Sequence, residues 1–224
     1  MIAVAAFEIE LWGKRFGVPA DRFVVIPNGA DLPPLARSGR EVTIGRPLIA
    51  SIGRLERYKG HQRIIAAMPY ILAQCPDVQL WIAGVGPYES TLSDLAKELN
   101  VSDHVEIRAV PVSERVQFAE EVSQAALVVL LSEYETHPIA VLEAIALGRP
   151  ALVAATSGLN EIADRGLAQA IPLDSTPRQV AEAVFDQLLH PHVPPPFRLP
   201  TWDDCATDLF TLYQQVVRES VCVS

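Results

Sequence analysis

Short apolar runs alternate with helical patterns along the chain from about residue 48 onward. Six runs are continuous or rich in β-branched residues, as strands buried on both faces require, and they lie at Leu48–Ile52, Val78–Ala83, Val105–Ile107, Leu127–Leu131, Ala151–Ala154 and Gln169–Ile171. Between these runs apolar residues recur at helical spacing, as in 64–72 and 180–188. The alternation predicts an α/β fold with a Rossmann-like, doubly wound parallel sheet.

The two ends of the chain fall outside this pattern. The first 35 residues combine a helical stretch with a short apolar run, and a proline-rich stretch from residue 191 leads into a last helix from about Thr201. We therefore expect a sheet domain over residues 36–198, preceded by a separate segment, 1–35, and followed by a terminal helix in 199–224.

Composition limits the choice of partners and compartment. Half of the 224 residues are apolar, so the chain can bury a sizeable core, and its net charge of −9 disfavours nucleic acid. Three cysteines without metal-ligand spacing are typical of a reducing cytoplasm, and no apolar run approaches the length of a membrane span. Phe7, Leu11 and Trp12 beside Lys14 and Arg15 leave a membrane-surface contact open, although ordinary packing explains them better.

The first stretch with candidate chemistry is Ser51–Gly60, where a strand runs into a glycine-containing loop and then a helix. Such joints bind phosphates, because helix N-termini present unpaired N–H groups. Basic residues gather at this joint, namely Arg54, Arg57, Lys59 and Arg63. They indicate an anion site, or alternatively a solvated basic helix start that Glu56 partly neutralises. The P-loop pattern is absent, which argues against an ATPase or GTPase.

The second stretch, Gly84-Val-Gly86, also follows a strand and precedes a helix. It is a weak dinucleotide-binding signal, because Glu89 occupies the place of the third glycine and would repel a pyrophosphate. A tight strand-to-helix turn, with some backbone near a ligand, is the favoured interpretation.

The third stretch contains two acids eight positions apart, Glu135 and Glu143. We expect Thr136 to cap a helix that Pro138 pre-organises near its first turn, leaving Glu135 in the loop at the sheet's carboxyl edge. Glu143 then lies in an apolar helix, where a carboxylate needs donors, and ribose hydroxyls are suitable. The alternative is that Glu143 faces solvent or holds a structural arginine.

These stretches together resemble a known family. Gly53-Arg54-Leu55, Lys59-Gly60, Gly84-x-Gly86-Pro87, Glu135-x7-Glu143 and Gly148-x-Pro150 are similar, in order and spacing, to the donor domain of the glycosyl transferase group 1 family. The segment 25–31 also resembles that family's interdomain segment, and Trp202 resembles the residue that opens its final helix. The resemblance covers nearly the whole chain.

The resemblance implies the C-terminal half of a GT-B enzyme: a retaining, metal-independent transferase that moves a hexosyl group from a nucleotide sugar, with no other cofactor. Arg54 and Lys59 would stabilise the diphosphate leaving group in place of a metal. Glu143 would bind the ribose, and Glu135 would orient the donor sugar and join the two cations as a catalytic residue. Donor binding would also involve Gly53, Gly84, Val110, Thr136 and His137.

The chain departs from the family pattern at several positions. Pro138 stands where the family usually has glycine, Ser157-Gly158 replaces two adjacent glycines, and Ala109-Val110-Pro111 lacks the usual glycine near the base. Residues 1–35 would be only the tail of an acceptor-binding domain, so transfer would need that domain from a partner chain, unless the sequence is a fragment of a longer protein. A non-catalytic nucleotide-sugar-binding or regulatory module, and a sugar-nucleotide epimerase, remain as alternatives.

Overall fold

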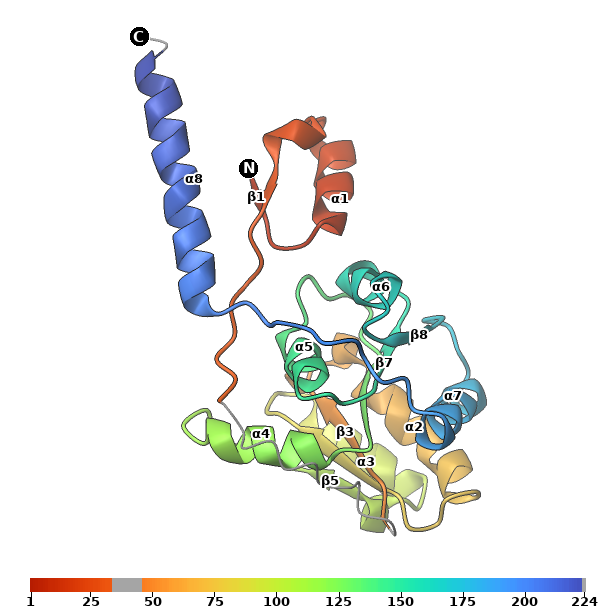
Figure 1. Cartoon of the computed structure of the whole chain (residues 1–224). Coiled ribbons are helices and arrows are strands. Elements are labelled where there is room, and N and C mark those ends of the chain that lie inside the picture. Colours follow the sequence, from red (N-terminus) through yellow and green to blue (C-terminus); the bar gives the residue numbers. More distant parts are fainter. Residues whose placement is uncertain (34–45, 223–224) are drawn as a thin grey trace. The chain divides into compact units, whose positions relative to one another are not determined.

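The computed structural model describes residues 1–33 and 46–222, with side chains through 218 (Figure 1). The chain divides into two compact units, one formed by Met1–Asp31 with Arg198–Ser224, and the other by Leu32–Phe197.

The larger unit contains a six-stranded, wholly parallel sheet with strand order β5-β4-β3-β6-β7-β8. Its strands are β3 (Leu48–Ile52), β4 (Gln79–Ala83), β5 (Val105–Ile107), β6 (Leu127–Leu130), β7 (Ala151–Ala154) and β8 (Gln169–Ile171). All six predicted strands are confirmed, with β4 beginning and β6 ending one residue inside the predicted bounds. The predicted α/β fold class is therefore confirmed.

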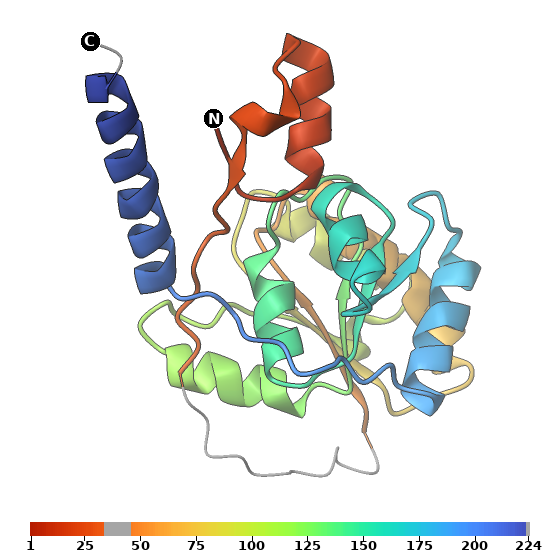
Figure 2. The ribbon, with the colours of Figure 1, turned by 45° about the horizontal axis from the view of Figure 1, so that its top comes forward.

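Helices cover both faces of the sheet, as a doubly wound fold requires. They are α2 (His61–Leu72), α3 (Glu89–Glu98), α4 (Arg115–Gln124), α5 (Ile139–Ala146), α6 (Ser157–Asp164) and α7 (Pro177–Leu189), with single turns η2 (Arg57–Lys59) and η3 (Ser102–His104). Helix α2 packs against α3 and α7. Figures 1 and 2 show α4 and α5 on one side of the sheet, where Phe118 and Ala144 join Trp81 of β4 in a core cluster.

The strand order reverses at the centre of the sheet. From β3 the chain moves outward to β4 and β5, then returns to place β6 on the other side of β3 and continues to β7 and β8. The helices that follow β3 and β6, α2 and α5, therefore lie on opposite faces of the sheet. Ligands of open α/β sheets bind at such switch points.

In the smaller unit, strand β1 (Ile2–Ala3) pairs in parallel with β2 (Val24–Val25), and α1 (Phe7–Phe16) and the turn η1 (Ala20–Arg22) lie between them in the chain. The last helix is α8 (Trp202–Cys222). Gly29 lies against the start of α8, where an added Cβ would be 2.3 Å from the Trp202 nitrogen. Within the part of the chain that the structure describes, no helix is both long and apolar enough to cross a bilayer.

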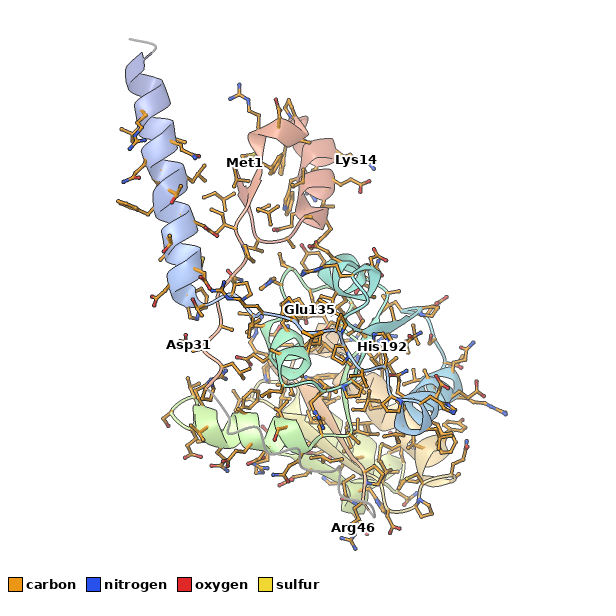
Figure 3. All side chains as sticks on the ribbon, viewed as in Figure 1. Met1, Lys14, Asp31, Arg46, Glu135 and His192 are labelled. Carbon is orange, nitrogen blue, oxygen red and sulfur yellow. The ribbon has the colours of Figure 1, made fainter. Side chains whose placement is uncertain are left out.

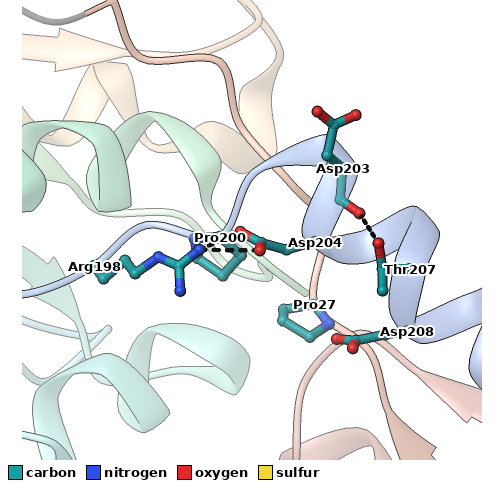
Figure 4. A pocket seen from close by; sticks show the side chains of 7 residues that line it. All are labelled: Pro27, Arg198, Pro200, Asp203, Asp204, Thr207 and Asp208. Atoms are coloured by element: carbon teal, nitrogen blue, oxygen red, sulfur yellow. Dashed lines mark hydrogen bonds and ion pairs between the residues drawn. The ribbon is translucent and has the colours of Figure 1, made fainter.

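A hollow of about 420 Å³ lies within this smaller unit (Figure 4). Its lining comprises Pro27, Arg198, Pro200, Asp203, Asp204, Thr207 and Asp208. Arg198 pairs with Asp204 at 3.0 Å, and backbone and hydroxyl donation from Thr201 lowers the pKa of Asp204. The remaining aspartates make this hollow unsuitable for a diphosphate, so we place the candidate site in the larger unit.

Candidate functional site

The loops that follow β3 and β6 are in direct contact. Gly60 has a φ of 78°, and a Cβ there would lie 2.0 Å from the backbone oxygen of Leu131, so only glycine fits. The Glu133 N–H donates to the Tyr58 carbonyl at 2.8 Å, and Ser132 Oγ lies 3.2 Å from the Lys59 carbonyl oxygen. Both loops are thereby joined at the switch point.

The loop after β4 packs on the loop after β3 with similar closeness. A Cβ on Gly84 would lie 1.9 Å from the Gly53 oxygen, and one on Gly86 would lie 2.4 Å from the Leu55 oxygen. The Leu55 N–H also donates to the Val85 carbonyl at 2.9 Å. The glycines at 84 and 86 are therefore required for loop packing, as the tight-turn interpretation expects.

His61, the first residue of α2, anchors the β3 loop from inside the protein. Its side chain is fully buried; Ser51 Oγ lies 2.8 Å from Nδ1, and the Arg54 carbonyl lies 3.2 Å from Nε2. Burial lowers the His61 pKa to about 4. The ring is thus neutral; since the carbonyl can only accept, Nε2 carries the hydrogen and Nδ1 accepts from Ser51. Nothing in the sequence pattern indicated this contact.

Lys59 and Glu135 form the central ion pair of the site. Lys59 Nζ lies 2.7 and 3.0 Å from the two carboxylate oxygens of Glu135, and the side chains are only 15% and 9% exposed. Ser132 Oγ donates to the same carboxylate at 2.7 Å. The structure therefore brings together two predicted site residues that are 76 positions apart. Figure 3 shows Glu135 near α5.

Ser157 holds the backbone of the Glu135 loop. Its hydroxyl accepts from the Glu135 N–H at 2.8 Å, while the Gly158 N–H donates to the Glu135 carbonyl at 2.8 Å. Ser157 has a positive φ of 39°, which glycine adopts more readily. A Cβ on Gly158 would lie 2.3 Å from the Thr136 oxygen. The serine thus keeps the backbone conformation of a glycine position and adds a hydrogen bond.

Glu143 is buried on α5, with 4% of its surface exposed, and is held by an arginine. Arg115, the first residue of α4, donates through Nη2 to Glu143 Oε1. The Arg115 guanidinium also lies 4.9 Å from the centre of the Phe118 ring. The alternative in which Glu143 holds an arginine therefore describes this structure. Arg115 is 28 residues away in sequence, so local patterns could not reveal it.

Arg54 lies at the solvent surface, with 67% of its side chain exposed. Its guanidinium contacts Glu56 at 2.8 Å and the Tyr58 hydroxyl at 2.8 Å, both within its own loop. Glu56 thus neutralises part of the basic cluster, as the alternative interpretation expects. Lys59 is the cation of this loop that reaches Glu135.

The prediction that Thr136 caps α5 is wrong. Pro138 is the N-cap residue, the helix begins at Ile139, and no side chain bonds to this N-terminus. The Gly158 contacts hold the Thr136 backbone in the loop, two residues before the N-cap position. His137 in the same loop is half-buried, which lowers its pKa, and its Nδ1 has no hydrogen-bond partner among the described atoms. Val110 packs, partly buried, against the core cluster of α4 and α5.

Comparisons with known proteins place the chain in a family. The family model for glycosyl transferases group 1 matches residues 39–191, and the chain belongs to this family. A GDP-mannose-dependent α-(1-6)-phosphatidylinositol monomannoside mannosyltransferase from Mycolicibacterium smegmatis is 36% identical over 100 residues, covering 44% of this chain and 25% of the relative. The chain thus spans much less than the full length of this relative.

Solved structures show the same fold. Sucrose-phosphate synthase from Thermosynechococcus elongatus has a TM-score of 0.79 at 24% identity, covering 97% of this chain and 58% of that one. Anabaena Alr3699/HepE in complex with UDP has a TM-score of 0.68 at 18% identity, covering 99% and 63%. The larger unit therefore has the fold of the C-terminal domain of a GT-B glycosyltransferase.

Proposed function

We propose that the larger unit binds a nucleoside-diphosphate sugar and acts as the donor half of a retaining, metal-independent hexosyltransferase. The observation that carries the proposal is the Lys59–Glu135 pair at the switch point of the sheet. Acceptor contacts would come from an acceptor-binding domain, either elsewhere in a longer polypeptide or on a partner chain.

Electrostatics at the β3 loop suit a diphosphate. Lys59 offers a cation, and the N-terminus of α2 offers a partial positive charge. At Gly53 an added Cβ would lie 3.7 Å from Lys59 Cδ, so the glycine leaves room for an anion beside the Lys59 side chain. Glu135 neutralises Lys59 in the unliganded pair. An entering phosphate would share Lys59 with Glu135, while Arg54 can turn from the surface toward the outer phosphate.

The chemistry requires a good leaving group and an oriented sugar. As the bond between the anomeric carbon and the diphosphate oxygen breaks, Lys59 and Arg54 would stabilise the charge that develops on the diphosphate. The acceptor oxygen would join the anomeric carbon on the face that the diphosphate leaves, and the acceptor's hydroxyl proton would pass to the departing phosphate. Glu135 would hold the sugar in this geometry, and Glu143 would hold the ribose.

The relatives support a nucleotide-sugar donor. The Mycolicibacterium relative is GDP-mannose-dependent by name, and the HepE neighbour was crystallised with UDP. Membership of the glycosyl transferase family favours transfer over the epimerase alternative. The free thiols Cys75 and Cys205 are consistent with a reducing, cytoplasmic location.

Thermal stability in the presence of nucleotides tests the donor site. A ligand present at about one hundred times its Kd stabilises the folded protein by about 2.7 kcal/mol. For a chain of this size, this raises the melting temperature by roughly 5–10 °C. We expect such a shift with UDP, GDP or ADP, unchanged by EDTA, and its loss in Lys59→Ala. Lys97→Ala, which removes a surface cation paired with Asp94 on α3, is the matched control.

The proposal is wrong if no nucleoside diphosphate shifts the melting temperature, or if Lys59→Ala keeps the full shift. Transfer itself requires an added acceptor domain, and NMR of the anomeric proton would report retention. Binding without transfer in that assay would favour the non-catalytic module instead.

A further inference from the structure

Arg115 occupies an unfavourable place for a cation. It is the first residue of α4, where the helix dipole is positive, and no side chain caps this N-terminus. Its guanidinium is held instead by the Glu143 carboxylate and by the face of the Phe118 ring. Positions at which a sequence breaks such local rules are often functional.

Burying the charged carboxylate of Glu143, the partner of Arg115, also costs free energy. The Glu143 side chain is only 5% exposed, between the buried residues Leu142 and Ala144 of α5. An apolar pair of similar volume is often as stable as a buried ion pair, or more stable. Fold stability alone therefore gives no reason for an arginine and a glutamate at these two positions.

We propose that Arg115 is a positioning residue, which fixes the orientation of the Glu143 carboxylate and balances its charge so that it can accept hydrogen bonds from the ribose of a bound nucleotide. This inference rests on the proposed donor-binding function. It assigns to each acid of the Glu135–Glu143 pair its own cation, Lys59 and Arg115. With both carboxylates balanced, the diphosphate meets less electrostatic repulsion.

The inference predicts an effect confined to the ribose. If Arg115 acts through Glu143, its replacement weakens binding of nucleotides that carry ribose hydroxyls. Binding of a 2′,3′-dideoxy nucleotide, which lacks the hydroxyls that Glu143 would accept from, stays nearly unchanged. A merely structural role would weaken both ligands alike.

The experiment measures, by calorimetry, the Kd of whichever of UDP, GDP and ADP binds most tightly, and the Kd of its 2′,3′-dideoxy counterpart. Wild type should prefer the ribose form by about tenfold or more, the range of a hydrogen bond to a charged group. Arg115→Met, which keeps the apolar stem over Phe118, should reduce this preference to less than about twofold. Arg115→Lys keeps the charge and should restore part of it.

Arg108→Met is the matched control. Like Arg115, Arg108 pairs with a glutamate and lies over an aromatic ring: its partner is Glu121 of α4, at 2.6 Å, and the ring is that of Trp81, at 5.2 Å. The two arginine side chains are similarly exposed, at 40% for Arg108 and 35% for Arg115. The ribose preference should survive in this variant. In a Glu143→Gln background, adding Arg115→Met should change the preference no further, because the two residues act as one unit.

The outcomes separate the two proposals. Equal weakening of both ligands by Arg115→Met, an unchanged ribose preference, or an additive effect in the Glu143→Gln background would overturn the role of Arg115 alone. Absence of nucleotide binding by the wild type would overturn the proposed function, and this inference with it.

Discussion

His61 provides a quantitative test of how the site is built. Its imidazole is fully buried beneath the β3 loop, where it joins Ser51 to the Arg54 carbonyl. The perturbation is His61→Asn, which keeps an acceptor for the Ser51 hydroxyl but removes the titrating ring. The variant should be less stable than wild type at neutral pH, because the carbonyl of Arg54 loses its donor.

The magnitude follows from the His61 pKa, which burial lowers from an ordinary value near 6.5 to about 4. A lowered histidine pKa means that the unfolded chain binds the proton more tightly, so stability is fully present above about pH 6.5 and is lost as the pH falls toward 4. A pH of 5 is about 1.5 units below the pKa of the histidine in the unfolded chain. The free energy of unfolding at pH 5 is therefore lower by about 2 kcal/mol than at pH 7.5.

The assay is urea denaturation at about pH 7.5 and pH 5, followed by fluorescence of Trp81 in a background where Trp12 and Trp202 are phenylalanine. Carboxylates with lowered pKa, such as Glu121, lose stability equally in both proteins and cancel in the difference. The stability gap between wild type and His61→Asn should therefore shrink by about 2 kcal/mol at pH 5. A gap that stays constant between the two pH values would refute the reasoning.

Two further predictions address the loops and the ion pair. Gly148→Ala, at a φ of 73° with open space around it, should cost about 1 kcal/mol in thermal or urea unfolding. Gly60→Ala, at a φ of 78° with a backbone oxygen 2.0 Å from the new Cβ, should cost at least about 3 kcal/mol, and equal losses would contradict the steric argument. Glu135→Gln should tighten nucleoside-diphosphate binding by roughly tenfold, because Lys59 is released, yet abolish sugar transfer; weaker binding measured by calorimetry would contradict this.

The positions of the strands along the chain could be predicted because they depend on local sequence. A buried parallel strand must be apolar on both faces, so runs such as Leu127–Leu130 are recognisable without any tertiary contact. The start of α5 could not be predicted in the same way. Thr136 is a good N-cap residue, but packing against Gly158 holds it in the loop, and Pro138 takes the cap position.

The candidate site was partly visible in the sequence. Lys59 and Glu135 stood out through charge clustering and motif spacing, and the structure places them in contact. Ser132 could have been noticed, since it lies only three residues before Glu135 and can reach its carboxylate. Ser157 was visible only as a departure from the family pattern, and its bond to the Glu135 backbone depends on how α6 lies beside that loop.

The sequence by itself determined the α/β class, the six strands and the segments that carry charged or glycine-rich chemistry, because hydrophobic periodicity and composition act over a few residues. Only the tertiary structure decided which charges meet. Lys59 pairs with Glu135 across 76 residues and Arg115 with Glu143 across 28, whereas Arg54 stays with its own loop. Such pairings depend on strand order and helix packing, which bring residues that are far apart in the sequence to one edge of the sheet. Local sequence patterns do not indicate which of these residues come into contact.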